Sequence, residues 1–185
     1  MIAVVGGTGR LGRRVVTRLI QAGDADVRVL TRDPARLPED LVGLVEVAQA
    51  DVRDPASLPR ALAGVTTVIS AITGFGGVDA GGAGAVDRDG NIALIEAAEA
   101  AGVRRFVLLS VEGAAADAPV SLFRAKHAAE ARLRATSMAW AIVRPTAYLE
   151  TWLEIVGAPL VATGSTRVFG RGRNPVNFVS ADDVA

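Results

Sequence analysis

The chain opens with a short apolar stretch that is followed at once by closely spaced glycines. Ile2 to Val5 is apolar, and residues 6–12 are Gly-Gly-Thr-Gly-Arg-Leu-Gly. Apolar residues then recur at the spacing of an amphipathic helix at Val15, Val16, Leu19 and Ile20. A glycine turn between a strand and a helix lets the backbone approach a pyrophosphate, whose charge meets the helix N-terminus. The pattern therefore predicts a dinucleotide site made by Gly6, Gly7, Thr8, Gly9, Arg10, Leu11 and Gly12.

Composition narrows the class of protein further. The 185 residues are enough for one domain with a substantial core, and the net charge is zero, which argues against direct nucleic-acid or anionic-membrane partners. No apolar run is long enough to span a bilayer, and the first residues lack the basic and apolar segments of a signal peptide. With no cysteine and one histidine, we expect no metal site and a cytoplasmic protein. The sequence leaves the oligomeric state open.

Strand and helix patterns alternate as far as residue 143. Strands are expected at Ile2–Val5, Val27–Thr31, Gly43–Gln49, Val65–Ala71, Arg105–Leu109 and Ala139–Val143. Helices are expected after the glycine turn and at Pro55–Ala63, Asn91–Ala101 and Pro119–Ala135. Strands separated by helices predict an α/β, doubly wound parallel-sheet Rossmann fold with the strand order 3-2-1-4-5-6. Residues 1–145 then form the NAD(P)-binding domain.

Two regions depart from this regular pattern. Residues 73–90 contain seven glycines in eighteen residues, and we expect a mobile loop or lid at the ligand edge of the sheet. In residues 146–185 we expect a helix at Leu149–Val156, short strands near Arg167–Phe169 and Val176–Val179, and a helix start capped by Ser180. We interpret 146–185 as a partial substrate-binding region that is shortened at its C-terminal end.

The end of the second expected strand bears on which cofactor binds. NAD-specific sites place an acid there for the ribose 2′-hydroxyl, whereas an arginine nearby suits the 2′-phosphate of NADP. Here Thr31 stands at that position and Arg32 follows it, which favours NADP(H) over NAD(H). Asp33 lies beyond the position at which the acid of an NAD site is expected, and it either pairs with an arginine or caps the next turn. Asp51 and Val52 follow strand three, and we expect them beside the adenine. Ala71 ends strand four, and we expect it to pass beside the cofactor.

Several segments together resemble one known family. The motifs are residues 6–12, Val-Asp-Arg-Asp-Gly-Asn at 86–91, residues 100–107, Phe-Arg-Ala-Lys at 123–126, residues 143–148 and residues 176–185. In this order they resemble the NmrA-like branch of the atypical short-chain dehydrogenase/reductases. The glycine spacing Gly6-x-x-Gly9-x-x-Gly12 is also that of this superfamily, while Gly7-x-Gly9-x-x-Gly12 is the general Rossmann spacing. Family members continue well past residue 185.

The resemblance implies catalytic candidates and one departure. Reductases of the superfamily use Ser, Tyr and Lys, and Ser110 and Lys126 match the first and last of these. Lys126 is also the only lysine, beside nineteen arginines, among 20 basic residues. The Tyr position, four residues before the lysine, is Leu122, so the usual proton-donating phenol is missing. Tyr148 is a candidate for the substrate pocket, whereas Trp140 and Trp152 are expected in the core.

Three kinds of function fit these residues. The first is NADPH-dependent reduction of a small organic acceptor such as a quinone, with Lys126 placing the cofactor or acting as acid or base. The second is a non-catalytic NADP(H)-binding redox sensor or regulatory or assembly protein, which regulatory family members imply. A nucleotide-sugar epimerase-like enzyme is a further alternative. The expected partner is a small-molecule substrate or none.

Overall fold

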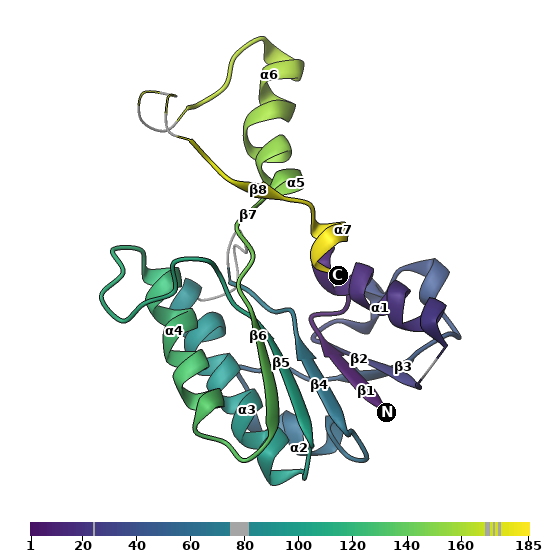
Figure 1. Ribbon diagram of the computed structural model, residues 1–185. Coiled ribbons are helices and arrows are strands. Elements are labelled where there is room, and N and C mark those ends of the chain that lie inside the picture. Colours follow the sequence, from purple (N-terminus) through teal and green to yellow (C-terminus); the bar gives the residue numbers. More distant parts are fainter. Residues whose placement is uncertain (24, 75–81, 169–170, 172, 174) are drawn as a thin grey trace.

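The computed structural model describes residues 1–23, 25–74, 82–168, 171, 173 and 175–185. Its centre is a six-stranded, fully parallel sheet with the strand order β3-β2-β1-β4-β5-β6 (Figure 1). The strands are β1 (Ile2–Val5), β2 (Val27–Thr31), β3 (Glu46–Gln49), β4 (Thr67–Ser70), β5 (Arg105–Leu109) and β6 (Ala139–Val143). The doubly wound Rossmann fold and the strand order expected from the sequence are confirmed.

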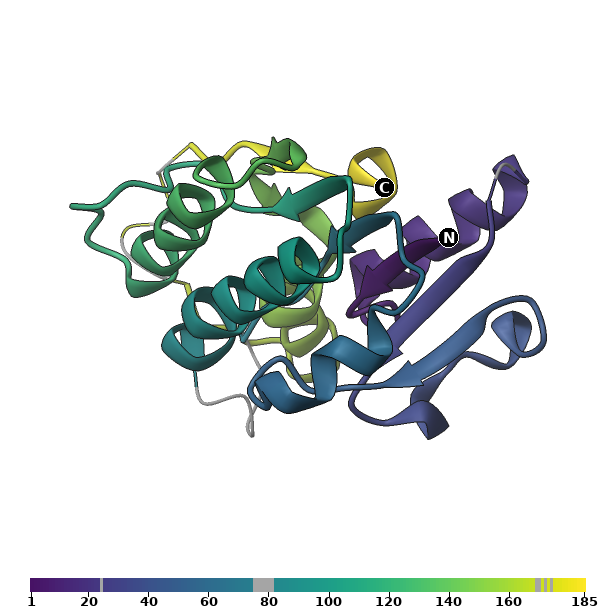
Figure 2. The ribbon, with the colours of Figure 1, turned by 90° about the horizontal axis from the view of Figure 1, so that it is seen from below.

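Helices cover both faces of this sheet (Figure 2). The helix α1 (Arg10–Ala22) packs on one face, and α2 (Leu58–Ala61), α3 (Asn91–Ala100) and α4 (Ser121–Arg134) pack on the other. Successive residues of a strand point to opposite faces. Val4 therefore joins Val16 in the smaller core under α1, whereas Ala3 and Val5 join Leu94 in the larger core on the opposite face. This packing holds the carboxyl ends of all six strands along one edge.

The turn between β1 and α1 has the geometry that its glycines allow. Gly6 has a φ of +81°, in the left-handed region that favours glycine. A Cβ on Gly12 would lie 2.1 Å from the carbonyl oxygen of Gly6, and a Cβ on Gly7 would lie 2.9 Å from Cγ1 of Val29. Any side chain at Gly7 or Gly12 would push α1 away from the sheet, so these glycines set the close packing of the helix on the strands.

The glycine-rich segment 73–90 differs from the expected loop. Residues 75–81 lie outside the described residues, so the expectation of a lid there stays a prediction. Residues 82 and 83 are helical, and Gly84–Gly90 forms a π-helical turn, η4, that runs directly into α3. Asp87 is buried, and a Cβ on Gly90 would lie 2.6 Å from Cγ2 of Val52. The expectation of a loop as far as Gly90 is wrong because this half packs against Val52 and α4.

The shorter elements occur where the sequence predicts them, but some of their bounds differ by a few residues. Asp54 caps a 3-10 turn, η3 (Pro55–Ser57), by accepting a hydrogen bond from the N–H of Ala56, and α2 follows. The third strand begins at Glu46 and not at Gly43, because Gly43 to Val45 lie in a turn in which Leu44 is exposed. The fourth strand is likewise two residues shorter at its start and one shorter at its end than expected.

The two tryptophans are not placed as the sequence suggests. Trp140 is not in the core: its residue is 45% exposed on β6, and the guanidinium carbon of Arg134 lies 5.9 Å from its ring centroid. The reason is that β6 is the outer strand of the sheet, so burial depends on topology and not on the apolar character of the side chain. Trp152 is only partly buried and contacts the ring of Phe178 edge-on, with 6.4 Å between centroids.

Beyond residue 145 the chain extends away from the carboxyl edge of the sheet (Figure 1). A short parallel pair joins β7 (Ala147–Tyr148) to β8 (Phe178–Val179). Between them a helical run consists of α5 (Leu149–Trp152), the π-helical η5 (Leu153–Gly157) and α6 (Ala158–Thr163), which confirms the expected helix and lengthens it. The strand expected near Arg167–Phe169 is absent at residues 167 and 168, and residue 169 lies outside the described part. Of the strand expected at Val176–Val179, only residues 178 and 179 are in a strand.

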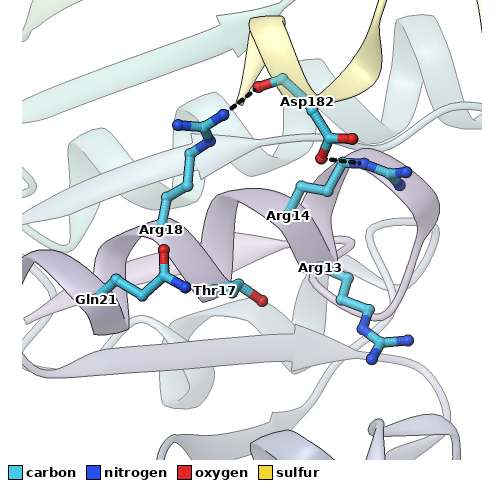
Figure 3. A pocket seen from close by; sticks show the side chains of 6 residues that line it. All are labelled: Arg13, Arg14, Thr17, Arg18, Gln21 and Asp182. Atoms are coloured by element: carbon cyan, nitrogen blue, oxygen red, sulfur yellow. Dashed lines mark hydrogen bonds and ion pairs between the residues drawn. The ribbon is translucent and has the colours of Figure 1, made fainter.

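The final helix, α7 (Ala181–Val184), returns to lie against α1 (Figure 3). As expected, Ser180 caps it, with its Oγ accepting a 3.1 Å hydrogen bond from the N–H of Asp182. Nε of Arg14 donates to Oδ1 of Asp182 at 2.7 Å, and Nη2 of Arg18 donates to the Asp182 carbonyl at 2.7 Å (Figure 3). Segment 146–185 is thus tied at both ends to the Rossmann domain. Within the described residues, no helix has the length and hydropathy needed to cross a bilayer.

Candidate functional site

A cavity of about 980 Å³ lies at the carboxyl edge of the sheet, bounded on its far side by residues of 146–185. It brings together twelve of the fourteen residues expected at the site. These are Gly6, Thr8, Gly9, Arg10, Leu11, Arg32, Asp51, Val52, Ala71, Ser110, Lys126 and Tyr148. Gly7 and Gly12 do not line it, because they pack α1 against the sheet. The glycine turn thus divides into positions that face the cavity and positions that allow close packing.

The first turn of α1 lies at the wall of this cavity, which Gly9, Arg10 and Leu11 line. The N–H of Arg13 makes a helical hydrogen bond to the carbonyl of Gly9 at 2.9 Å, so the N–H groups of Arg10, Leu11 and Gly12 precede that bond. The first turn carries no acidic side chain. These donors and the positive end of the helix dipole suit a bound anion, and the small residues beside them let a diphosphate come close.

Positive charge gathers where β2 and β3 end. Arg32 and Arg36 line the cavity there. Thr31 ends β2, and its hydroxyl donates to the carbonyl of Asp33 at 3.2 Å. Asp33 caps a 3-10 turn, η1 (Pro34–Arg36), by accepting a 3.0 Å hydrogen bond from the N–H of Ala35. The capping alternative for Asp33 is therefore the one that occurs. Asp33 also lines the cavity, but its Oδ1 accepts from the N–H of Ala35, and the residue that ends β2 is Thr31.

Asp51 lies in the cavity wall but is engaged by a neighbouring arginine. Nε of Arg53 donates to Oδ1 of Asp51 at 3.0 Å and Nη2 donates to Oδ2 at 2.6 Å. These hydrogen bonds, with the charges of Arg53 and Arg32, lower the pKa of the Asp51 carboxyl although burial opposes them. Arg36 and Arg53 were not expected at the site. The clue was the number of arginines that follow β2 and β3, but sequence alone does not show which of them point inward.

Arg10 meets an acid from the opposite wall. Its guanidinium forms an ion pair with the exposed carboxylate of Glu154, which belongs to η5. The hydrogen bond that Arg10 donates to Glu154 raises the pKa of Arg10, and the ion pair joins the glycine turn to the C-terminal segment across the cavity. An anion near Arg10 would therefore compete with Glu154 for the guanidinium. This contact was not foreseen, because the two residues are far apart in the sequence.

Lys126 reaches the cavity from α4 and is 4% exposed. Its Nζ donates to the carbonyl of Ile72 at 2.9 Å and lies 3.1 Å from Oδ1 of Asp87. Burial lowers the pKa of Lys126, and the negative charge of Asp87 opposes that decrease without cancelling it. Asp87 was not among the expected site residues, although it lies in the 86–91 motif that carries the family resemblance.

Ser110 is held by a buried acid of the next helix. Its hydroxyl donates to Oε1 of Glu130 at 2.5 Å, and Glu130 is fully buried. Arg144 and Arg134 also donate to this carboxylate. Burial raises the pKa of Glu130, but the bonds from Arg144, Ser110 and Arg134 outweigh it and the net pKa is lowered. An ionised Glu130 accepts the hydrogen bond of the Ser110 hydroxyl, so the lone pairs of the serine oxygen are left to accept hydrogen bonds from other groups. Sequence reasoning missed Glu130.

The remaining wall is apolar and aromatic. Leu122 lines the cavity at the position where related reductases carry a tyrosine. Tyr148, the single tyrosine, lines it from β7, and burial raises the pKa of its phenol to about 12. Trp152 also lines the cavity, which corrects the expectation that it belongs to the core. This end of the cavity can hold a flat apolar group, but its phenol stays protonated at neutral pH.

Comparison with known proteins gives a consistent picture. A family model described as NAD(P)H-binding matches residues 6–185. The chain is 33% identical over 186 residues to the NAD(P)H azoreductase of Xenophilus azovorans, and 27% identical over 184 residues to the photosystem II assembly factor Ycf39 of Guillardia theta. All of this chain is matched, but only 60% and 58% of those two proteins. The chain therefore spans less than two thirds of the length of these curated relatives.

Solved structures agree with this assignment. The NADPH complex of an NADPH-dependent quinone oxidoreductase from Escherichia coli has a TM-score of 0.72 and 27% identity, over 88% of this chain and 54% of that one. Citrobacter sp. triphenylmethane reductase complexed with NADP(H) has a TM-score of 0.79 over 100% and 62% of the two chains, and its 23% identity shows a shared fold alone. From the family match and the glycine turn that opens it, the chain belongs to the NAD(P)H-binding family, in the NmrA-like group of atypical short-chain dehydrogenase/reductases.

Proposed function

We propose that the chain binds NADPH in this cavity, in preference to NADH, and reduces a small organic acceptor such as a quinone or an azo compound. The part of this proposal that concerns NADPH rests on the residues that line the cavity. The cavity wall joins the N-terminal end of α1 to two arginines that follow β2, Arg32 and Arg36. The strand ends at Thr31, and the carboxylate that follows, Asp33, caps the next turn. A guanidinium pairs well with a phosphate, whereas a ribose hydroxyl is better served by an acid.

The residues present fit the cofactor along its length. The first turn of α1 would hold the diphosphate, Arg32 and Arg36 the 2′-phosphate, and Val52 the adenine, while Ala71 would lie along the cofactor. Lys126 lies beside Ile72, just after the end of β4, and would donate from Nζ to the ribose next to the nicotinamide. When bound, the nicotinamide supplies hydride. The protein holds the acceptor against it and keeps Lys126 charged nearby.

The missing phenol supports the choice of acceptor. Leu122 replaces the usual tyrosine, and the hydroxyl of Ser110 donates its hydrogen bond to Glu130, so neither of these two positions supplies a proton to a simple ketone. The raised pKa makes the phenol of Tyr148 a weaker acid than an ordinary tyrosine. A quinone that accepts hydride becomes a hydroquinone anion whose charge is delocalised, and water can supply its proton afterwards. The names of an azoreductase relative and a quinone oxidoreductase neighbour support the same acceptor class. Tyr148 and Trp152 would form the wall behind it, so that 146–185 serves as part of the substrate region.

The experiment for the cofactor is a calorimetric titration of NADPH and NADH into the wild-type chain and the variant Arg32→Ala. We expect tighter NADPH binding in the wild type, and a loss of at least about tenfold, or 1.4 kcal/mol, for NADPH in the variant with little change for NADH. Arg60→Ala, an exposed arginine on α2 outside the cavity, is the matched control. An equal loss of affinity for NADPH and NADH would show that Arg32 does not bind the 2′-phosphate.

A second candidate, an NADP(H)-binding regulatory or assembly protein without turnover, rests on the same residues. The wall lacks a proton donor at Leu122, and the Ycf39 relative is named for assembly and not for catalysis. NADPH oxidation followed with a panel of quinones and azo dyes separates the two. Turnover well above that of a Lys126→Met variant supports the reductase, whereas tight NADPH binding without turnover supports the regulatory protein.

A further inference from the structure

Asp87 is a fully buried carboxylate that the cofactor assignment does not use. Its Oδ2 accepts a 2.8 Å hydrogen bond from the N–H of Gly74. Its Oδ1 lies 3.1 Å from Nζ of Lys126, yet among the described residues it accepts no hydrogen bond of good geometry. The contact between Asp87 and Lys126 is therefore chiefly one between opposite charges, in a place where neither side chain is more than 5% exposed.

Asp87 is held there by a second buried polar group. Asn91 at the start of α3 donates from Nδ2 to the carbonyls of Val86 and Asp87, at 3.3 and 3.1 Å. Its Oδ1 accepts a 2.7 Å hydrogen bond from the hydroxyl of Ser70, at the end of β4. These bonds fix the π-helical turn η4 against the sheet. The carboxylate of Asp87 is consequently aimed at Lys126 by the backbone that carries it.

A buried ammonium needs such a partner. Removal from water disfavours the charged form of lysine, and an opposite charge within about 4–6 Å restores it. The other neighbour of Nζ, the carbonyl of Ile72, accepts a hydrogen bond but carries no net charge. Losing one member of a buried ion pair leaves an uncompensated charge or a neutral base.

Within the part of the chain that the structure describes, the other charged groups on the elements around Lys126 pair elsewhere. On η4, Arg88 and Asp89 pair with each other at the surface. On α3, Glu96 and Glu99 both pair with Arg132. Glu130 on α4 is bonded to Ser110, Arg144 and Arg134, and β6 carries no titratable side chain. Across the cavity stands Tyr148 with a raised pKa. Asp87 is the carboxylate whose charge acts directly on Lys126.

We propose that Asp87 is a positioning residue for Lys126: it anchors the lysine at the wall of the cavity and supplies the counter-charge that keeps its ammonium protonated at neutral pH. The consequence for NADPH rests on the proposed function of the cavity, because a neutral or displaced Lys126 would no longer hold the nicotinamide ribose as a charged donor. The ion pair itself is a property of the chain without any cofactor.

The single lysine makes a direct test possible. With ¹³Cε-labelled lysine, the chain gives one lysine NMR signal, which reports the protonation of Lys126 across a pH series. The variant Asp87→Asn keeps the shape of the side chain and removes its charge, and Asp89→Asn removes an exposed acid two residues away as the matched control. We expect the midpoint to fall by about one to three pH units in Asp87→Asn, the range typical of losing an adjacent opposite charge, and to stay unchanged in Asp89→Asn. An unchanged midpoint in Asp87→Asn overturns the proposal.

The test remains decisive when Asp87→Asn does not fold. In that case the double variant Asp87→Asn, Lys126→Met removes the uncompensated charge as well, and we expect it to recover a cooperative thermal transition. A double variant that is as unfolded as the single one would show that Asp87 stabilises the fold only through its hydrogen bond with the N–H of Gly74, and the proposal would fail.

Binding of NADPH tests the consequence separately. For Asp87→Asn we expect the dissociation constant to rise by about tenfold between acidic and mildly alkaline pH, as Lys126 loses its charge, while the wild type and Asp89→Asn stay nearly constant over the same range. If the wild type does not bind NADPH, the proposed function fails and the NMR result still decides the role of Asp87. If the NMR midpoint shifts but binding is independent of pH, Lys126 does not contact the cofactor as a cation and the functional part is overturned.

Discussion

The hydroxyl of Ser110 donates a 2.5 Å hydrogen bond to Oε1 of Glu130, a carboxylate that solvent does not reach. Arg144 donates to both oxygens of the same carboxylate, at 2.8 and 2.6 Å, and Arg134 adds a third guanidinium contact at 2.9 Å. The end of β5, the end of β6 and the middle of α4 therefore meet at one side chain. Glu130 joins the framework of the fold to a residue of the cavity wall.

We predict that Glu130→Gln destabilises the fold. The amide keeps a polar contact with Ser110 but leaves Arg144 and Arg134 without their counter-charge. Breaking a buried ion pair typically costs about 3–5 kcal/mol, and we expect the free energy of unfolding to fall by about 2–3 kcal/mol because both guanidinium groups keep some solvent contact. Urea unfolding measures this. Glu96→Gln, an exposed partner of Arg132, is the control and should change the midpoint little; equal effects would reject the role of Glu130.

The same residue predicts a dependence of stability on acid. The folded pKa of Glu130 lies below its unfolded value of about 4.3, so as the pH falls the unfolded state takes up a proton first. The stability contributed by Glu130 is therefore complete above that value and is lost as the pH falls from there through the folded pKa. Thermal melting in small pH steps should show a shallower acid slope for Glu130→Gln than for the wild type. Parallel slopes would mean that other carboxylates account for the loss.

Lys126→Arg is predicted to impair function although it keeps the charge. A guanidinium is larger than an ammonium, is planar, and does not fit between the Ile72 carbonyl and Asp87 in the same way. We expect NADPH-dependent quinone reduction to fall by at least about tenfold, the lower part of the range for a positioned acid–base group. If the protein has no turnover, we expect instead that the variant binds NADPH more weakly than the wild type, as measured by calorimetry. Wild-type rates and binding in the variant would show that any cation serves at this position.

Leu122→Tyr is predicted to add the donor that the wall lacks. The position lies in the cavity four residues before Lys126, so a phenol there would stand near a charged ammonium and an acceptor. We expect reduction of simple ketones or aldehydes by NADPH to rise by about tenfold or more, within the range for general acid catalysis. Leu122→Phe has nearly the same volume without the hydroxyl and is the control. A gain shared by both variants would trace to shape and not to the proton.

The sequence alone was sufficient to predict the order of strands and helices and the fold that they form. The glycine turn after Val5, the alternation of strands and helices and the capped turn at Asp54 depend on neighbouring residues, and each is present in the structure. The place of Lys126 on α4 was also predictable, because the order of elements in a Rossmann fold fixes which helix faces the ligand edge.

Tertiary structure decided which polar groups meet. Asp87 and Lys126 are separated by the last three residues of η4, all of α3 and β5, and part of α4, and Arg10 meets Glu154 from the opposite wall of the cavity. Trp140 is exposed and Trp152 lines the cavity for the same reason: the burial of a side chain depends on what packs over it. Local patterns determine backbone geometry through short-range sterics and hydrogen bonds. Charge partners and burial depend on distances across the sheet, and these exist only once the chain has folded.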